Sequence, residues 1–170
     1  MGPKSWWTAW MNDKERKVEV MESFEKQTFR NRCLIFSRQG ELIRLSIPVE
    51  KAERKQLTRD VKISYQTKWQ HQHWMALRSS YERTPYFLYY EDYIRPMYEK
   101  QITYLIDWNE ELIEILSGLL VNNPNQKLQL TPTTDWQQET WTDSHPWQTE
   151  VSIVDSLFWK GPEWCLEFRV

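Results

Sequence analysis

The sequence predicts an α/β (or α+β) domain in which helices pack on a single central β-sheet. Two patterns carry this prediction. Runs of β-branched residues in the first 65 positions alternate with period two, and apolar residues from about 96 to 121 recur at spacings of three and four. A chain of 170 residues, 40% of them hydrophobic, is long enough for one compact domain and too short to expect two. We therefore treat 1–170 as a single domain.

The sheet is predicted from several short segments. "CLIFSRQGELIRLSIPV", residues 33–49, is two runs of β-forming residues around a turn at Gly40, which is the pattern of a hairpin. Residues 61–65, "VKISY", alternate in the same way, so we expect a sheet of at least three strands. Two further candidate strands are "VEVMESF" at 18–24 and "WCLEFRV" at 164–170.

Helical signals occur in four segments: residues 5–12, 67–84, about 96–121 and 152–158. The third is a long amphipathic helix, and Pro96 suits its first turn because the missing N–H would have no partner there. Ser152 and Gly161 suit the two ends of the last helix. The polar stretch 122–150 between the last two helices predicts a lid, a binding loop or a disordered segment.

Composition excludes several classes of function. A net charge of -2 and a pI of about 6.0 argue against a surface that grips nucleic acid. The sequence has no apolar run long enough to span a bilayer and no secretory layout at its start, so it predicts a cytoplasmic protein without a transmembrane segment. Four glycines form no nucleotide-binding loop and no serine-hydrolase elbow, and we expect no cofactor. Eleven tryptophans exceed what a core of this size requires and suggest platforms that stack sugars or bases.

A basic cluster stands in "KQTFRNRC", residues 26–33. If residues 28–33 are extended, Arg30 and Arg32 point to the same side, where two guanidinium groups would hold a phosphate or a carboxylate. The alternative is an ordinary strand edge that pairs with Glu22 or Glu25. Both interpretations stay open on spacing alone.

Two histidines stand in "WQHQHW". On a helix, residues two apart point about 200° from each other, so His71 and His73 cannot chelate one ion, and we predict no metal site. His73 is a candidate general base or a satisfied core histidine, because imidazole titrates near neutrality. Asn109, the polar residue in the apolar stripe of the long helix, should bond to a neighbouring element or face a pocket. Asp60, directly after Arg59, and Tyr98 with Glu99 offer the acids that a mechanism would need.

Several blocks of the sequence resemble one family in order and spacing. They are "KQTFRNRC", "LSIPVE", "RDVKIS", "WQHQHWMALRSSYERTPYFLYYED", "YEKQITYLIDWNEELIEIL" and "SIVDSLFWKGPE". The pattern is similar to that of the WbqC-like protein family, in the compact branch of Bacteroides-like bacteria. The resemblance implies a bacterial cytoplasmic protein associated with gene clusters for surface polysaccharide or lipopolysaccharide O-antigen. It also implies a hydrophobic strand before the first aromatic pair, Trp6 and Trp7, and the sequence starts without one.

The family's recurrent polar residues are carried over position by position. They fall on Asn31, Arg32, Arg59, Asp60, His73, Tyr81, Asp107, Asn109 and Asp155. This agreement favours the anion site at Arg30 and Arg32. The resemblance also implies transfer of an amino acid such as glycine onto a sugar, the role proposed for the family.

Two hypotheses of different classes follow. The first is a transferase acting on a nucleotide-linked or lipid-linked sugar: the arginines neutralise its phosphates, Trp69 or Trp74 stacks its ring, and His73 relays a proton with Asp60 or Asn109 orienting it. The second is a non-catalytic carbohydrate-binding or assembly protein of the same pathway, which docks on a partner protein through the aromatic surface of 136–147.

Overall fold

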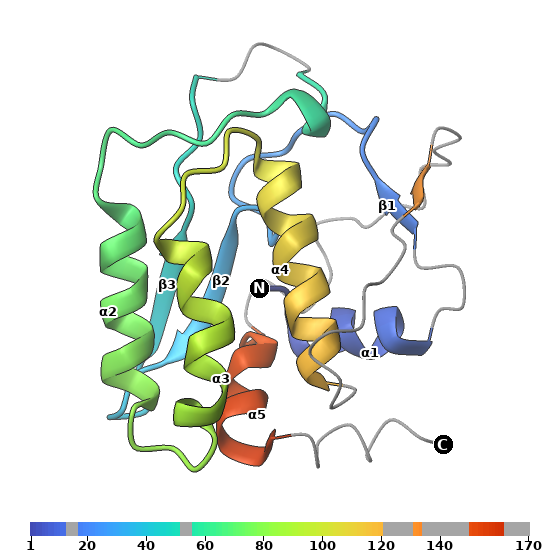
Figure 1. The fold of residues 1–170 in the computed structure, drawn as a ribbon. Coiled ribbons are helices and arrows are strands. Elements are labelled where there is room, and N and C mark those ends of the chain that lie inside the picture. Colours follow the sequence, from blue (N-terminus) through green and yellow to red (C-terminus); the bar gives the residue numbers. More distant parts are fainter. Residues whose placement is uncertain (13–16, 52–55, 121–130, 134–149, 162–170) are drawn as a thin grey trace.

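The structure is a computed structural model that describes residues 1–12, 17–51, 56–120, 131–133 and 150–161 (Figure 1). In this part of the chain, five α-helices pack with a small antiparallel hairpin. The predicted mixed α/β fold is therefore confirmed. None of the described helices is both long enough and apolar enough to cross a lipid bilayer.

The predicted hairpin is present as β2 (Arg32–Phe36) and β3 (Leu42–Ser46), which pair antiparallel. Gly40 lies in the turn with φ +85°, a backbone conformation that glycine adopts without strain. Side chains of β3 alternate as predicted, because Leu42 and Arg44 are exposed whereas Ile43 is partly and Leu45 fully buried. Ile35 on β2 is buried as well. The hairpin lies behind α2 and α3 in Figure 1.

The sheet is smaller than the predicted three strands. The described strands form two separate two-stranded sheets, and residues 61–65 contribute only isolated bridges to Val49 and Tyr104. The physical reason is that the segment forms only one bridge with each of its two neighbours, so no continuous ladder develops on either side. Ile63 N–H donates to Thr103 on one side, and Ser64 N–H donates to Pro48 on the other.

The second sheet lies apart from the hairpin. It joins β1 (Lys17–Glu19) to β4 (Thr131–Thr133) in parallel, so only the first part of the candidate strand 18–24 is realised. The candidate strand at 164–170 and most of the loop predicted at 122–150 lie outside the described residues.

The helices are α1 (Lys4–Asn12), α2 (Trp69–Tyr81), α3 (Phe87–Ile94), α4 (Leu105–Leu120) and α5 (Ile153–Lys160). The helices predicted near 5–12, 67–84 and 152–158 are confirmed as α1, α2 and α5. Ser152 caps α5, since its hydroxyl accepts a hydrogen bond from Val154 N–H, and Gly161 ends the helix with φ +59°.

The long helix predicted from 96 is wrong at its start, because α4 begins at Leu105. Pro96 lies instead in a short 3-10 helix, η2 (Arg95–Tyr98). The chain then leaves helical geometry, because Ile102 exchanges hydrogen bonds with the Tyr65 hydroxyl through both its N–H and its carbonyl. Helix α3 was not predicted, because its aromatic residues show no clear apolar stripe.

Aromatic rings form the centre of the core. Trp69 on α2 lies against four other rings, Tyr65, His73, Tyr98 and Trp108, with centroids 5.1 to 6.5 Å away. These contacts join α2, η2 and α4 into one layer. A large cleft lies on one side of this layer and a small cavity on the other.

Candidate functional site

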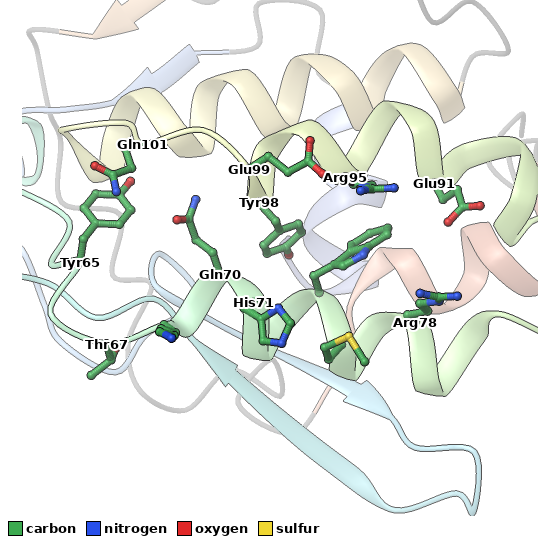
Figure 2. A pocket seen from close by; sticks show the side chains of 13 residues that line it. Tyr65, Thr67, Gln70, His71, Arg78, Glu91, Arg95, Tyr98, Glu99 and Gln101 are labelled. Atoms are coloured by element: carbon green, nitrogen blue, oxygen red, sulfur yellow. Dashed lines mark hydrogen bonds and ion pairs between the residues drawn. The ribbon is translucent and has the colours of Figure 1, made fainter.

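A cleft of about 670 Å³ runs along α2, between that helix and the segment from α3 to η2 (Figure 2). Thr67 and Lys68 mark one end of α2 and Arg78 the other. At a rise of about 1.5 Å per residue, positions 68 and 78 lie about 15 Å apart. The cleft is therefore long enough for a ligand of more than one ring.

The two ends of the cleft differ in chemistry. Figure 2 shows the amides of Gln70 and Gln101 together at one end, near Tyr65. Arg78 and Glu91 stand at the other end and point toward each other. One end of the groove thus offers side-chain amides beside the ammonium group of Lys68, and the other end offers charges of both signs.

Trp74 is the aromatic platform of the cleft. Its half-buried indole packs against Phe87, with centroids 6.1 Å apart, and against Tyr98 at 6.0 Å. These contacts hold the ring in place while it lines the groove. Trp69, the other predicted stacking residue, is 2% exposed in the core and does not line the cleft.

Charges of both signs line the cleft. Arg95 Nε lies 2.6 Å from Glu99 Oε1, and both side chains are more than half exposed. Such helical surface pairs contribute only about 0.3–0.5 kcal/mol, so a ligand can replace them at little cost. The side chains of Lys68 and Glu91 pair with no other described residue.

A second hollow, which we call the depression, lies on the other side of the aromatic layer. It measures about 10 Å³ and is lined by Arg32 of β2, His73 of α2 and Asn109 of α4. That volume holds one water-sized group. Five predicted site residues line it: Arg30, Asn31, Arg32, His73 and Asn109.

His73 is buried beside the depression. Its Nε2 lies 3.1 Å from the Ser46 carbonyl oxygen, which can only accept, so Nε2 carries the proton and Nδ1 is left as an acceptor. Burial lowers the pKa of His73 to about 4, against a smaller opposing effect of the Ser46 hydrogen bond. The ring is therefore neutral at physiological pH. His71, two positions away, is exposed in the cleft, as the helical geometry predicted.

The two asparagines tie the walls of the depression together. Asn109 Nδ2 donates to the Arg30 carbonyl at 2.9 Å, and Asn31 Nδ2 donates to the Ile47 carbonyl at 3.2 Å. Asn109 therefore does both things expected of it, since it bonds to a neighbouring element and also lines a hollow.

The arginines differ from each other. Residues 26–31 form turns, so the extended geometry expected to align Arg30 with Arg32 is wrong. Arg30 forms a bidentate pair with Glu22, 2.5 Å to each carboxylate oxygen, so the alternative pairing is present, but at a turn and not at a strand edge. Arg32 Nε is buried and has no partner among the described residues.

The remaining predicted site residues lie elsewhere. Tyr81 is buried between α2, β2 and α5, and its hydroxyl donates to Asp155. Arg59 and Asp60 pair with each other at 3.6 Å in the 3-10 helix η1 (Thr58–Asp60), and both are about half exposed. Neither lines the cleft or the depression, so the predicted partnership of Asp60 with His73 has no contact to support it.

Sequence reasoning missed most of the cleft. Of the residues that line it, only Trp74 was predicted as a ligand contact. The available signal was the spacing of Thr67, His71, Trp74 and Arg78 at intervals of four, three and four. A tryptophan on the polar face of an amphipathic helix marks a surface that does not belong to the core.

The sequence was also compared with known proteins. Among curated proteins and solved structures, none matches the chain. The sequence pattern of the WbqC-like protein family matches residues 20–130, which is more than half of the chain. The match covers α2, α3, η2, the whole lining of the cleft and most of the depression. The chain belongs to the WbqC-like protein family.

Proposed function

We propose that this protein binds a sugar bearing an anionic group in the cleft along α2, as part of bacterial surface-polysaccharide or lipopolysaccharide O-antigen biosynthesis. The ligand class is a nucleotide sugar or another phosphorylated sugar. The observation that carries the proposal is the 670 Å³ cleft itself, in which one fixed indole lies among side-chain amides and charges of both signs.

The chemistry of sugars matches this lining. A sugar ring offers an apolar face to an aromatic side chain and hydroxyls that both donate and accept. Gln70 Nε2 is engaged with the Lys100 carbonyl at 2.6 Å, so its Oε1 remains an acceptor for a ligand hydroxyl. Lys68, unpaired among the described residues, is a cation for a phosphate or carboxylate. The volume falls within the usual 300–1,000 Å³ of sites for molecules of this size.

Binding of this kind requires no bond to be made or broken, so a carbohydrate-binding or assembly protein is the function the cleft supports best. A second candidate is transfer of an amino-acyl or similar group to the bound sugar. One observation favours it: His71 and Glu91 line the same cleft and are side chains of the kinds that move protons. His73 supports transfer less well, because its Nε2–H is donated to the Ser46 carbonyl oxygen and the depression admits only one water-sized group.

A thermal-shift screen of the whole chain tests the proposal. The panel contains neutral sugars, sugar phosphates, nucleotide sugars, free nucleotides and amino acids. A ligand that binds only the folded state stabilises it by about 2.7 kcal/mol at a hundredfold excess over its Kd. We expect sugar phosphates or nucleotide sugars to raise the melting temperature more than neutral sugars do. No shift by any sugar would reject the proposal.

Mass spectrometry of the mixtures that bind separates the two candidates. Unchanged ligands after long incubation favour binding alone. A new acylated sugar, formed only with both an amino-acyl donor and a sugar present, favours transfer.

A further inference from the structure

We propose a second binding site, at the depression, where Arg32 takes one oxygen of a small oxyanion, a carboxylate or a phosphate. The proposal does not rest on the function of the cleft. His71 and His73 are two positions apart on α2 and point about 200° from each other, one into the cleft and one toward the depression.

The first observation is the state of Arg32. Among the described residues it is the only charged side chain with a buried polar atom that has no hydrogen-bond partner. A guanidinium group keeps its proton at any physiological pH, so it cannot avoid the cost of an unmade hydrogen bond by becoming neutral. A negatively charged acceptor satisfies both the N–H group and the charge.

The second observation is the lack of a competing carboxylate. No aspartate or glutamate lines the depression in the part of the chain that the structure describes. Glu22 is engaged by Arg30 through both of its oxygens. The positive charge of Arg32 is therefore not compensated by the residues that line the hollow.

The third observation is the size and rigidity of the walls. The volume of about 10 Å³ admits one oxygen atom, while the rest of the ligand remains outside. The amide nitrogens of Asn31 and Asn109 already donate to backbone carbonyls, which fixes both side chains. Arg32 Nε is then a side-chain donor of the lining that has no partner among the described residues.

The test uses the full chain with 15N-labelled arginine and follows the arginine Nε–Hε signals by NMR. Acetate and inorganic phosphate are titrated separately at constant ionic strength, with chloride as the balancing salt. We expect the Arg32 signal to shift and saturate with at least one of the two oxyanions. The oxyanion that saturates at the lower concentration identifies the source as a carboxylate or a phosphate.

Two matched variants complete the experiment. Arg32→Lys keeps the positive charge but removes the guanidinium group with its Nε–H. We therefore expect the apparent affinity for the oxyanion to fall at least tenfold. Arg44→Lys makes the same change at an exposed position of β3 and should leave the titration unchanged. The proposal is overturned if the Arg32 signal shifts linearly without saturating, or if chloride alone produces the same shift. It is also overturned if the backbone amide signals of 31–33 still respond to the oxyanion in folded Arg32→Lys. If Arg32→Lys does not fold, the titration of the unmodified protein decides alone.

Discussion

The Tyr81 hydroxyl donates a hydrogen bond to Asp155 Oδ1 at 3.0 Å and accepts one from Phe36 N–H at 3.2 Å. One buried phenol thus connects α2, α5 and the end of β2. Burial raises the pKa of both Tyr81 and Asp155. Asp155 lies on α5, outside residues 20–130 that the family pattern matches, and its bond to Tyr81 joins elements of the fold.

Tyr81→Phe removes both hydrogen bonds and leaves the Phe36 N–H and an Asp155 carboxylate oxygen without this partner. We expect the free energy of unfolding to fall by roughly 1–3 kcal/mol. Urea denaturation measures the change. Tyr93→Phe is the matched control, since Tyr93 is 43% exposed on α3 and the same substitution there should cost less than about 0.5 kcal/mol. Equal losses in the two variants would refute the role of the Tyr81 hydroxyl.

Glu22→Gln breaks the bidentate pair with Arg30, whose side chains are only 19% and 14% exposed. An unpaired guanidinium group then remains in a largely buried place, and we expect a loss of roughly 2–4 kcal/mol. Glu82→Gln removes the partner of Arg78 in a pair that is 57% and 45% exposed, and should cost less than about 0.5 kcal/mol. Chemical denaturation at low and high salt compares them. A small effect of Glu22→Gln would mean that Arg30 is held by other contacts.

His73 should make the fold sensitive to acid. Its pKa is lowered from 6.5 to about 4, so the folded state favours the neutral ring. The corresponding stability is complete above pH 6.5 and is lost as the pH falls toward 4, in total about 3 kcal/mol. His73→Gln keeps a donor for Ser46 and removes the titration, so its melting temperature should vary less over this range. His71→Gln, on the exposed side of α2, should retain the full pH dependence of the unmodified chain.

Gly161 faces a steric limit that Gly40 does not. Both have positive φ, but a Cβ on Gly161 would lie 2.6 Å from the Tyr86 ring, whereas nothing lies within 4 Å of one on Gly40. Gly40→Ala should cost about 1–2 kcal/mol through backbone strain alone, and Gly161→Ala more than that. Urea denaturation of both variants measures the difference. Replacing Tyr86 by Ala in the Gly161→Ala background should recover part of the extra loss, and a full additive loss would contradict the steric explanation.

The elements predicted correctly are those whose signals are local. The hairpin has a glycine turn between alternating apolar residues, and α5 has a capping serine and a terminal glycine. The start of α4 was not predictable in this way, because the bonds between Tyr65 and Ile102 that end the helical path join residues 37 positions apart.

The same distinction between local signals and long-range contacts applies to the candidate site. That His71 and His73 face opposite ways follows from helix geometry alone. The pairing of Arg30 with Glu22 depends on turns at 26–31 that place the two side chains together, and no spacing rule in the sequence indicates those turns. The cleft is built from segments on both sides of Pro85, so its depth emerges only when α2 packs against α3 and η2.

Isothermal titration calorimetry of the best sugar ligand with Trp74→Ala shows whether the sugar binds in the cleft. Trp159→Ala is the matched control, because Trp159 is 56% exposed on α5 and does not line the cleft. Circular dichroism and a melting curve must first show that both variants fold. We expect Trp74→Ala to weaken binding at least tenfold and Trp159→Ala to leave the Kd unchanged. Unchanged affinity in folded Trp74→Ala, or an equal loss in both variants, would contradict the assignment of the cleft as the sugar site.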